Sequence, residues 1–256
     1  MTYPHQDGTS PEHTDRRIER KFFVPPQNIG LSYALLRQFC HQDKEYPDEQ
    51  INSLYFDTDN LDQYEKSSSG EYSKNKIRIR WYHSLDNYQE EVPIFVEIKL
   101  REGFATSKIR RRFLSPVDNL ETTRLHEGII SADSFIDTIA SFGYFPDAPI
   151  RPVIVISYRR YRFTEMLTGM RVALDYQIRS TIINRALGYV DQELTLAGGV
   201  IEVKGHRLEL PETLRRMSVL DLDWSRFSKY SSCLDAQLSG PDTLAGLWPV
   251  GRLNAD

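Results

Sequence analysis

Residues 74–82 read KNKIRIRWY, and this short stretch decides the fold class. Charged or polar side chains alternate with apolar ones, which is the two-residue period of a β-strand. One face of the predicted strand carries Lys74, Lys76, Arg78 and Arg80, and the other carries Ile77, Ile79 and Trp81. Such a strand has one face suited to a hydrophobic layer and one face crowded with cations.

The same alternation recurs along most of the chain. It predicts strands over residues 17–24, 51–57, 74–83, 94–101, 107–114, 152–163, 169–176, 178–185 and 200–204. Helical patterns fit residues 27–40, 131–142, 211–217 and 224–237. Many antiparallel strands with few helices between them favour a closed sheet. The predicted fold class is therefore α+β, an antiparallel β-barrel with flanking helices.

Composition bounds the class of protein. The chain has 256 residues, 40% of them hydrophobic, which is enough to bury one sizeable core. We expect a flexible lead-in over residues 1–15, a single domain over residues 16–238 and a tail over residues 239–256. A formal net charge of −4 argues against a nucleic-acid partner. Only Cys40 and Cys233 are present, and no apolar run is long enough to span a bilayer. We therefore expect a cytoplasmic protein without a transmembrane segment.

The charged faces of the predicted strands are unusually basic. For any one strand, a face exposed to water remains the simplest interpretation. Taken together the strands do not fit it, because like charges on adjacent strands repel each other. A Glu-x-Lys pair also recurs, at residues 19–21, 97–99 and 202–204. We therefore predict that the charged faces point inward around a lumen for a phosphate chain and a divalent ion, with the apolar faces outward under the helices.

Short motifs follow one another in order on these strands. They are ERKFFV at 19–24, SLYFDT at 53–58, IRIRWY at 77–82, EIK at 97–99, SKIR at 107–110, YRRYRF at 158–163, RVALD at 171–175, IEVK at 201–204 and RFSKY at 226–230. Over roughly residues 16–235 the chain thereby resembles the triphosphate-tunnel superfamily. Within it, the chain is most similar to the polyphosphate polymerase domain of the vacuolar transporter chaperone (VTC) family.

This resemblance implies an enzyme that transfers the terminal phosphoryl group of ATP to a growing polyphosphate chain, with Mn²⁺ or Mg²⁺ as cofactor. The residues that it implies for the phosphate-binding, catalytic wall are Lys21, Arg78, Arg80, Lys99, Lys108, Arg160 and Arg171. Further substrate contacts are implied for Tyr158, Lys66, Lys204, Arg226, Ser228, Lys229 and Tyr230. Glu202 is expected to be the principal metal ligand, together with Glu19 and Glu97.

The sequence also departs from other branches of the superfamily. Cyclases and triphosphatases begin with Glu-x-Glu-x-Lys, whereas Arg17 stands here at the first Glu position. This favours the polymerase branch over two alternatives that stay open, a triphosphate hydrolase and a non-catalytic polyphosphate-binding module. Larger family members carry membrane helices that this sequence lacks, so we expect any membrane component to be a separate partner.

Overall fold

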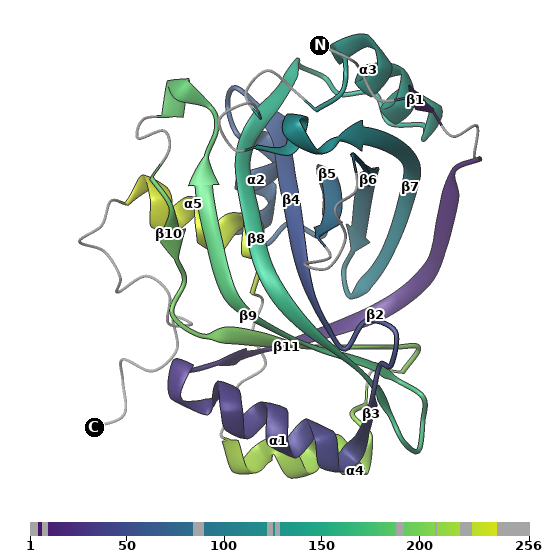
Figure 1. Ribbon diagram of the computed structural model, residues 1–256, viewed down its shortest axis with the longest axis vertical. Helices are drawn as coiled ribbons and strands as arrows, with labels where there is room; N and C mark the ends of the chain where they lie inside the picture. The colour runs from purple at the N-terminus through teal and green to yellow at the C-terminus, as the bar shows by residue number, and fades with distance from the viewer. Residues whose placement is uncertain are drawn as a thin grey trace.

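The computed structural model describes residues 5–6, 10–83, 90–121, 125, 129–187, 192–207, 209–220 and 227–239 (Figure 1). Its strands are β1 (His5–Gln6), β2 (Glu12–Val24), β3 (Cys40–Gln42), β4 (Asp48–Thr58), β5 (Ser73–His83), β6 (Glu91–Glu102), β7 (Ala105–Pro116), β8 (Ile150–Glu165), β9 (Arg171–Ile182), β10 (Leu194–Thr195) and β11 (Gly199–Gly205). Its helices are α1 (Ile29–Phe39), α2 (Asp62–Ser68), α3 (Ala132–Ser141), α4 (Glu212–Arg215) and α5 (Lys229–Leu238). Short 3₁₀ turns are η1 (Pro26–Asn28), η2 (Val117–Leu120), η4 (Arg185–Leu187) and η5 (Arg216–Leu220).

Eight of these strands close into a ring. Its order is β9-β11-β2-β7-β6-β5-β4-β8, and β8 pairs with β9 to complete the circle. Every neighbouring pair in the ring is antiparallel. The predicted antiparallel β-barrel with flanking helices is therefore confirmed.

Much of the hydrophobic core lies outside the barrel wall rather than within it. On β5, Ile77 and Ile79 are fully buried in a cluster that includes Phe135 and Ile139 of α3. A second cluster packs Leu36 of α1 and residues of α4 and η5 against β9 and β11. Figure 1 shows α1 and α4 together at one end of the molecule and α3 at the other. These apolar faces thus point outward under helices, as the strand alternation predicts.

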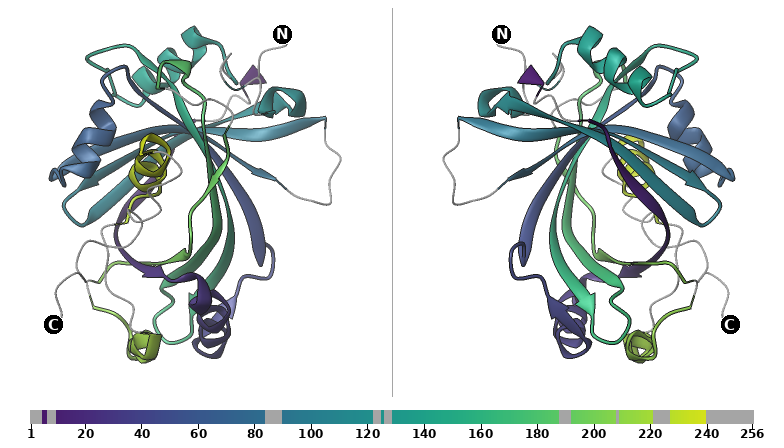
Figure 2. Two further views of the ribbon diagram at one scale, coloured as in Figure 1. Left: turned by 90° about the vertical axis from the view of Figure 1, so that its left-hand side faces the viewer. Right: turned by 90° about the vertical axis from the view of Figure 1, so that its right-hand side faces the viewer.

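Helix α5 is placed differently from the other helices, because it contacts β8, β9 and α2 at the end of the lumen (Figure 2). Its residues Tyr230 and Leu234 pack against Ile154 and Ile156 of β8. Those two isoleucines share the strand face of Tyr158, which lines the lumen. The inward face of β8 is therefore apolar where α5 covers it. The prediction that every apolar face points outward is wrong at this end.

The structure also corrects two predicted boundaries. Strand β2 begins at Glu12, so residues 12–15 belong to the barrel and not to a lead-in. The separate strands predicted over residues 169–176 and 178–185 are one strand, β9. Gln177 has a positive φ of 49°, and the pairing of β8 with β9 shifts by one residue there, which is a β-bulge. The bulge breaks the alternation without ending the strand.

Helix α2 was not predicted, because its seven residues are mostly polar and show no apolar period. Its backbone N–H groups at Gln63 and Tyr64 donate to the buried carboxylate of Asp57, which fixes its start. In the part of the chain that the structure describes, no helix has both the length and the apolar character needed to cross a bilayer.

Candidate functional site

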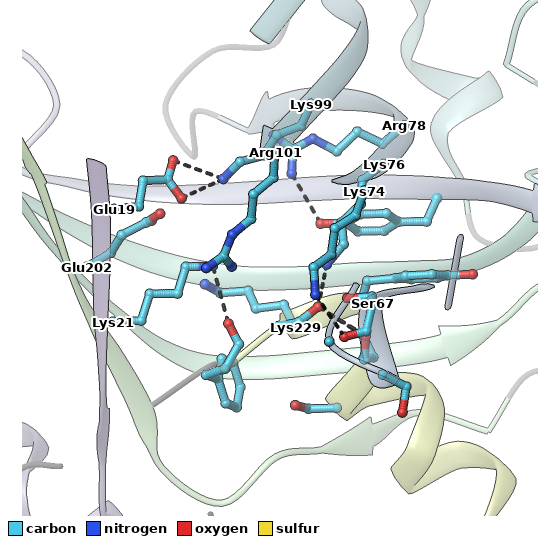
Figure 3. Close-up of a pocket in the computed structure, with 18 of the residues that line it drawn as sticks. Glu19, Lys21, Ser67, Lys74, Lys76, Arg78, Lys99, Arg101, Glu202 and Lys229 are labelled. Atoms are coloured by element: carbon cyan, nitrogen blue, oxygen red, sulfur yellow. Dashed lines mark hydrogen bonds and ion pairs between the residues drawn. The ribbon is translucent and has the colours of Figure 1, made fainter. Parts of the chain in front are cut away.

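Two cavities occupy the lumen of the barrel. The first has a volume of about 630 Å³ and the second about 590 Å³. Both are lined by Glu19, Arg78, Arg80, Lys99, Arg160, Glu202 and Lys204. Because they share these residues, the cavities meet at one central cluster of charges, part of which Figure 3 shows. The prediction that the charged faces of the strands line the lumen is confirmed for these residues.

A fully buried carboxylate beneath the lumen cations holds part of this cluster. Glu97 is fully buried, and its Oε2 accepts from Nε and Nη2 of Arg78 at 2.9 and 2.7 Å. Its Oε1 accepts from Lys108 at 3.1 Å, and Arg80 lies 3.8 Å from Oε2. Burial favours the neutral acid, but Arg78, Arg80 and Lys108 outweigh it and hold the pKa of Glu97 far below its usual range. Glu97 is thus a counterion for three cations.

A second buried carboxylate acts in the same way on the opposite wall. Asp175 accepts from Nε and Nη2 of Arg160 at 2.6 and 2.8 Å, and from Lys229 at 2.5 Å. Lys229 also lies 4.6 Å from the ring centroid of Tyr158. Burial raises the pKa of Tyr158, but Arg80 and Arg160 outweigh it, so the pKa of this phenol is lowered. Lys229 is the first residue of α5, so the N-terminal end of this helix contributes an ammonium group to the charge cluster.

Two further carboxylates line the lumen itself. Glu19 accepts from Lys99 at 2.6 and 2.9 Å, and Glu202 accepts from Arg160 at 3.2 Å. The Nζ atom of Lys204 lies 3.8 Å from Glu19 and 3.6 Å from Glu202, so the two carboxylates are neighbours. Burial opposes ionisation of Glu202, yet the surrounding cations hold its pKa well below the ordinary value.

These two carboxylates are the residues that fit a divalent ion. Among the described residues, no group of three or more His, Cys, Asp or Glu side chains is arranged to hold a metal. Mg²⁺ commonly takes only one or two carboxylates and completes its shell with water and substrate phosphates. Glu19 and Glu202 could supply these two carboxylates. Glu97 does not suit this role, because its carboxylate is fully buried, lines neither cavity and pairs with three cations.

Lys76 stands among other lumen cations. It is half-buried, donates to Oγ of Ser228 at 2.5 Å, and faces Lys21, Lys74 and Lys99. Burial and these like charges lower the pKa of Lys76 well below the usual lysine value. Such crowding is relieved when an anion enters. Lysines at this density therefore favour the binding of a polyanion.

The remaining predicted residues are only partly brought together. Arg171 lines the second cavity and Ser228 the first. Lys66 is exposed on α2 and lines neither cavity, so the structure does not bring it into the lumen. The hydroxyl of Tyr230 donates to Asp57 at 2.7 Å, which ties α5 to the barrel wall. Arg226 lies outside the described residues.

Sequence reasoning left other lumen residues without a role. Lys74, Lys76 and Arg101 line the first cavity, and Asp175 supports Arg160 from behind. The signal for the three cations was present, because they share strand faces with Arg78 or Lys99. The role of Asp175 had no such signal, because it depends on β8 and β9 lying side by side.

One sequence family and several solved structures match this chain. A sequence model described as the VTC domain matches residues 16–237. The search among curated proteins finds no match. Matching solved structures include a putative adenylate cyclase from Bacillus halodurans, with 15% identity, 84% of this chain and 96% of that chain covered, and a TM-score of 0.49. A putative adenylyl cyclase from Hippeastrum has 15% identity, with 90% of this chain and 99% of that chain covered and a TM-score of 0.46.

The family match spans most of the chain and includes every strand of the closed ring except the first few residues of β2. It also includes the central charge cluster, from Glu19 to Lys229. The chain belongs to the VTC domain family.

Proposed function

We propose that the protein is a polyphosphate polymerase, which transfers the terminal phosphoryl group of ATP to the end of a polyphosphate chain. The observation that carries this proposal is the meeting of two cavities at one cluster of cations. A donor triphosphate and an acceptor chain each need a cationic channel, and the two must meet where the phosphoryl group moves. Membership of the VTC domain family supports the same reaction.

Phosphoryl transfer needs mainly positioning and neutralisation of charge. An oxygen of the acceptor's terminal phosphate attacks the γ-phosphorus, a new P–O bond forms, and the bond to the β–γ bridging oxygen breaks to release ADP. Arg78, Arg80 and Arg160 are held in place by Glu97 and Asp175, so they are preorganised for the phosphoryl oxygens. No general base is needed, because a terminal phosphate is already anionic near neutral pH.

Glu19 and Glu202 are the residues that would hold the divalent ion. Mn²⁺ or Mg²⁺, when bound, neutralises charge on the phosphates and polarises the transferring group. Lys99 and Lys204 contact these carboxylates and position them at the centre of the lumen. Their ammonium groups would also donate hydrogen bonds to phosphoryl oxygens.

The test is incubation of the purified protein with ATP and Mn²⁺ or Mg²⁺, followed by separate assays for polymer, ADP and orthophosphate. A polymerase should form one ADP for each phosphoryl group that is added to long polyphosphate. Orthophosphate without polymer, from ATP or from tripolyphosphate, would instead identify a hydrolase. Binding of tripolyphosphate with no turnover of either substrate would identify a binding module.

A further inference from the structure

The two ends of the lumen carry different chemistry. The residues that line only the first cavity include hydroxyl side chains at the C-terminal end of α2 and the N-terminal end of α5, namely Ser67, Ser68, Ser69, Ser228, Ser231 and Ser232. Those that line only the second cavity include Arg17, Arg110, Arg162 and Arg171. The first end is thus rich in neutral hydrogen-bonding groups, and the second is rich in guanidinium groups.

An aromatic pair stands at the rim of the first cavity. Tyr72 is 75% exposed and Phe104 is 49% exposed, although both are large apolar side chains that line a pocket. Exposed aromatic groups at a cavity rim commonly serve a ligand. The two rings come from different segments, Tyr72 from the residues that precede β5 and Phe104 from the turn between β6 and β7.

Gly103 holds this pair together. Its φ is +57°, its N–H donates to the carbonyl of Tyr72 at 2.9 Å, and a Cβ added there would lie 2.8 Å from the Tyr72 ring. The ring of Tyr72 therefore rests directly on the turn that carries Phe104. Such close contact is open only to glycine at this position. The backbone thus fixes where the exposed rings stand.

Cations connect this rim to the central charge cluster. Figure 3 shows Lys74, Lys76 and Arg101 around the same pocket as Lys99 and Lys229. Lys74 donates to the carbonyl of Ser67 at 3.4 Å, and Arg101 to the carbonyl of Gly103 at 2.8 Å. The first cavity therefore has aromatic rings at its rim, hydroxyl groups and cations along its wall, and the central charge cluster at its inner end. The base, ribose and phosphates of a nucleotide are complementary to these three kinds of group.

We propose that Tyr72 and Phe104 form the base subsite of the ATP donor, which enters through the first cavity with its phosphates directed at Lys76 and the central cluster. The polyphosphate chain then occupies the second cavity. This inference rests on the proposed function, since it assigns the two cavities to that reaction's two substrates. Stacking on an aromatic face accepts any nucleobase, so the subsite is expected to distinguish nucleotides weakly.

The second cavity fits the chain better than it fits a nucleoside. The side chains of Arg17, Arg110 and Arg171 line this cavity, and guanidinium groups bind the phosphoryl oxygens along such a chain. The exposed aromatic residue at this end, Tyr46, already has the guanidinium of Arg162 5.8 Å from its ring centroid. Glu12, Asp43 and Glu45 also lie at this end, beside the arginines.

The test compares two ligands that differ by the nucleoside. The dissociation constants of inorganic tripolyphosphate and of an ATP analogue with a non-transferable γ-phosphate are measured with Mg²⁺ for the wild type, Tyr72→Ala, Phe104→Ala and the double variant. Phe145→Ala is the matched control, because Phe145 is 74% exposed and lines neither cavity. Tyr46→Ala probes the other end. Thermal unfolding checks that each variant is folded.

The inference expects the double variant to bind the ATP analogue about tenfold more weakly, since stacking on aromatic residues contributes on this scale. Binding of tripolyphosphate should not change, and neither should any binding by Phe145→Ala. An unchanged affinity for the ATP analogue, or an equal loss for both ligands, would overturn the base subsite. A loss with Tyr46→Ala alone would place the nucleotide at the opposite end. The proposed polymerase reaction fails separately, if wild-type protein binds ATP through these rings but makes no polymer.

Discussion

The two faces of strand β5 have opposite surroundings. Ile77 and Ile79 are fully buried in the apolar layer under α3, whereas Arg78 and Arg80 line both cavities of the lumen. Adjacent residues on β5 therefore contribute either to folding stability or to the charge of the lumen. The outward side chains supply hydrophobic stabilisation, and the inward ones hold charges together at the expense of stability. Substitutions at alternate positions should separate folding from chemistry.

The largest effect is expected at Glu202, on the lumen side. Glu202→Gln keeps the size of the side chain and removes the negative charge offered to the metal. We expect kcat for polymer synthesis to fall by at least about a thousandfold, as for loss of a key electrostatic group, in a variant that is still folded at the assay temperature. Steady-state assays with Mn²⁺ measure this.

The matched control is Glu193→Gln, which changes an exposed glutamate that pairs with Arg179 outside both cavities. Its activity should equal that of the wild type. Polymer formation by Glu202→Gln at the wild-type rate would remove Glu202 from the metal site.

Glu97→Gln should produce the next largest effect, because it tests whether the lumen cations need a buried counterion. The change leaves Arg78, Arg80 and Lys108 without their shared carboxylate. Removing one partner of a buried ion pair typically costs about 3–5 kcal/mol of unfolding free energy. Urea denaturation measures the loss, and added tripolyphosphate should recover more stability in this variant than in the wild type. Equal stability of the variant and the wild type without ligand would contradict the role of Glu97.

On the outward side, Ile79→Ala should cost about 3 kcal/mol of unfolding free energy, through lost burial and the cavity left behind. Below its unfolding temperature, the variant should keep the wild-type kcat and KM. Ile136→Ala is the matched control, since Ile136 of α3 is 43% exposed. It should shift the unfolding free energy by less than about 0.5 kcal/mol. A changed KM in folded Ile79→Ala would show that the two faces of the strand are not independent.

The smallest effect concerns pH. Burial lowers the pKa of Lys108 to about 8, although Glu97 opposes the shift, whereas an unfolded chain keeps this proton to about 10.5. As pH rises from 8 to 10.5, the penalty for burying this charge is relieved, so Lys108 alone makes the unliganded protein more stable. Loss of the same proton weakens tripolyphosphate binding, by at most about tenfold per pH unit.

Lys108→Arg keeps its charge throughout this range and controls for titration of the ligand itself. Between pH 7 and pH 9, the dissociation constant of tripolyphosphate should therefore rise more for the wild type than for this variant. Parallel pH profiles would contradict the titration of Lys108 in the lumen.

The barrel and most of its charged lining could be predicted from the sequence, because strand alternation states which residues share a face. Arg78, Arg80 and Lys99 follow from that rule alone. The partners of these residues could not be predicted in this way. Glu97 shares their alternation, and only the packing of three cations around it shows that it is a counterion. Lys66 was misplaced, because no apolar period marks the short helix that carries it.

The bulge at Gln177 decides how β9 serves the barrel. Before it, Asp175 supports the lumen cations, and after it Ile178 and Ile182 join the apolar cluster that seats α5. The bulge takes up one surplus residue, so Asp175 and Ile178, three positions apart, both point into the barrel. Without the bulge, regular alternation from Asp175 would present Arg179 and Thr181 to the helix instead. The bulge therefore keeps the charged lining and the apolar seat of α5 on one face of β9.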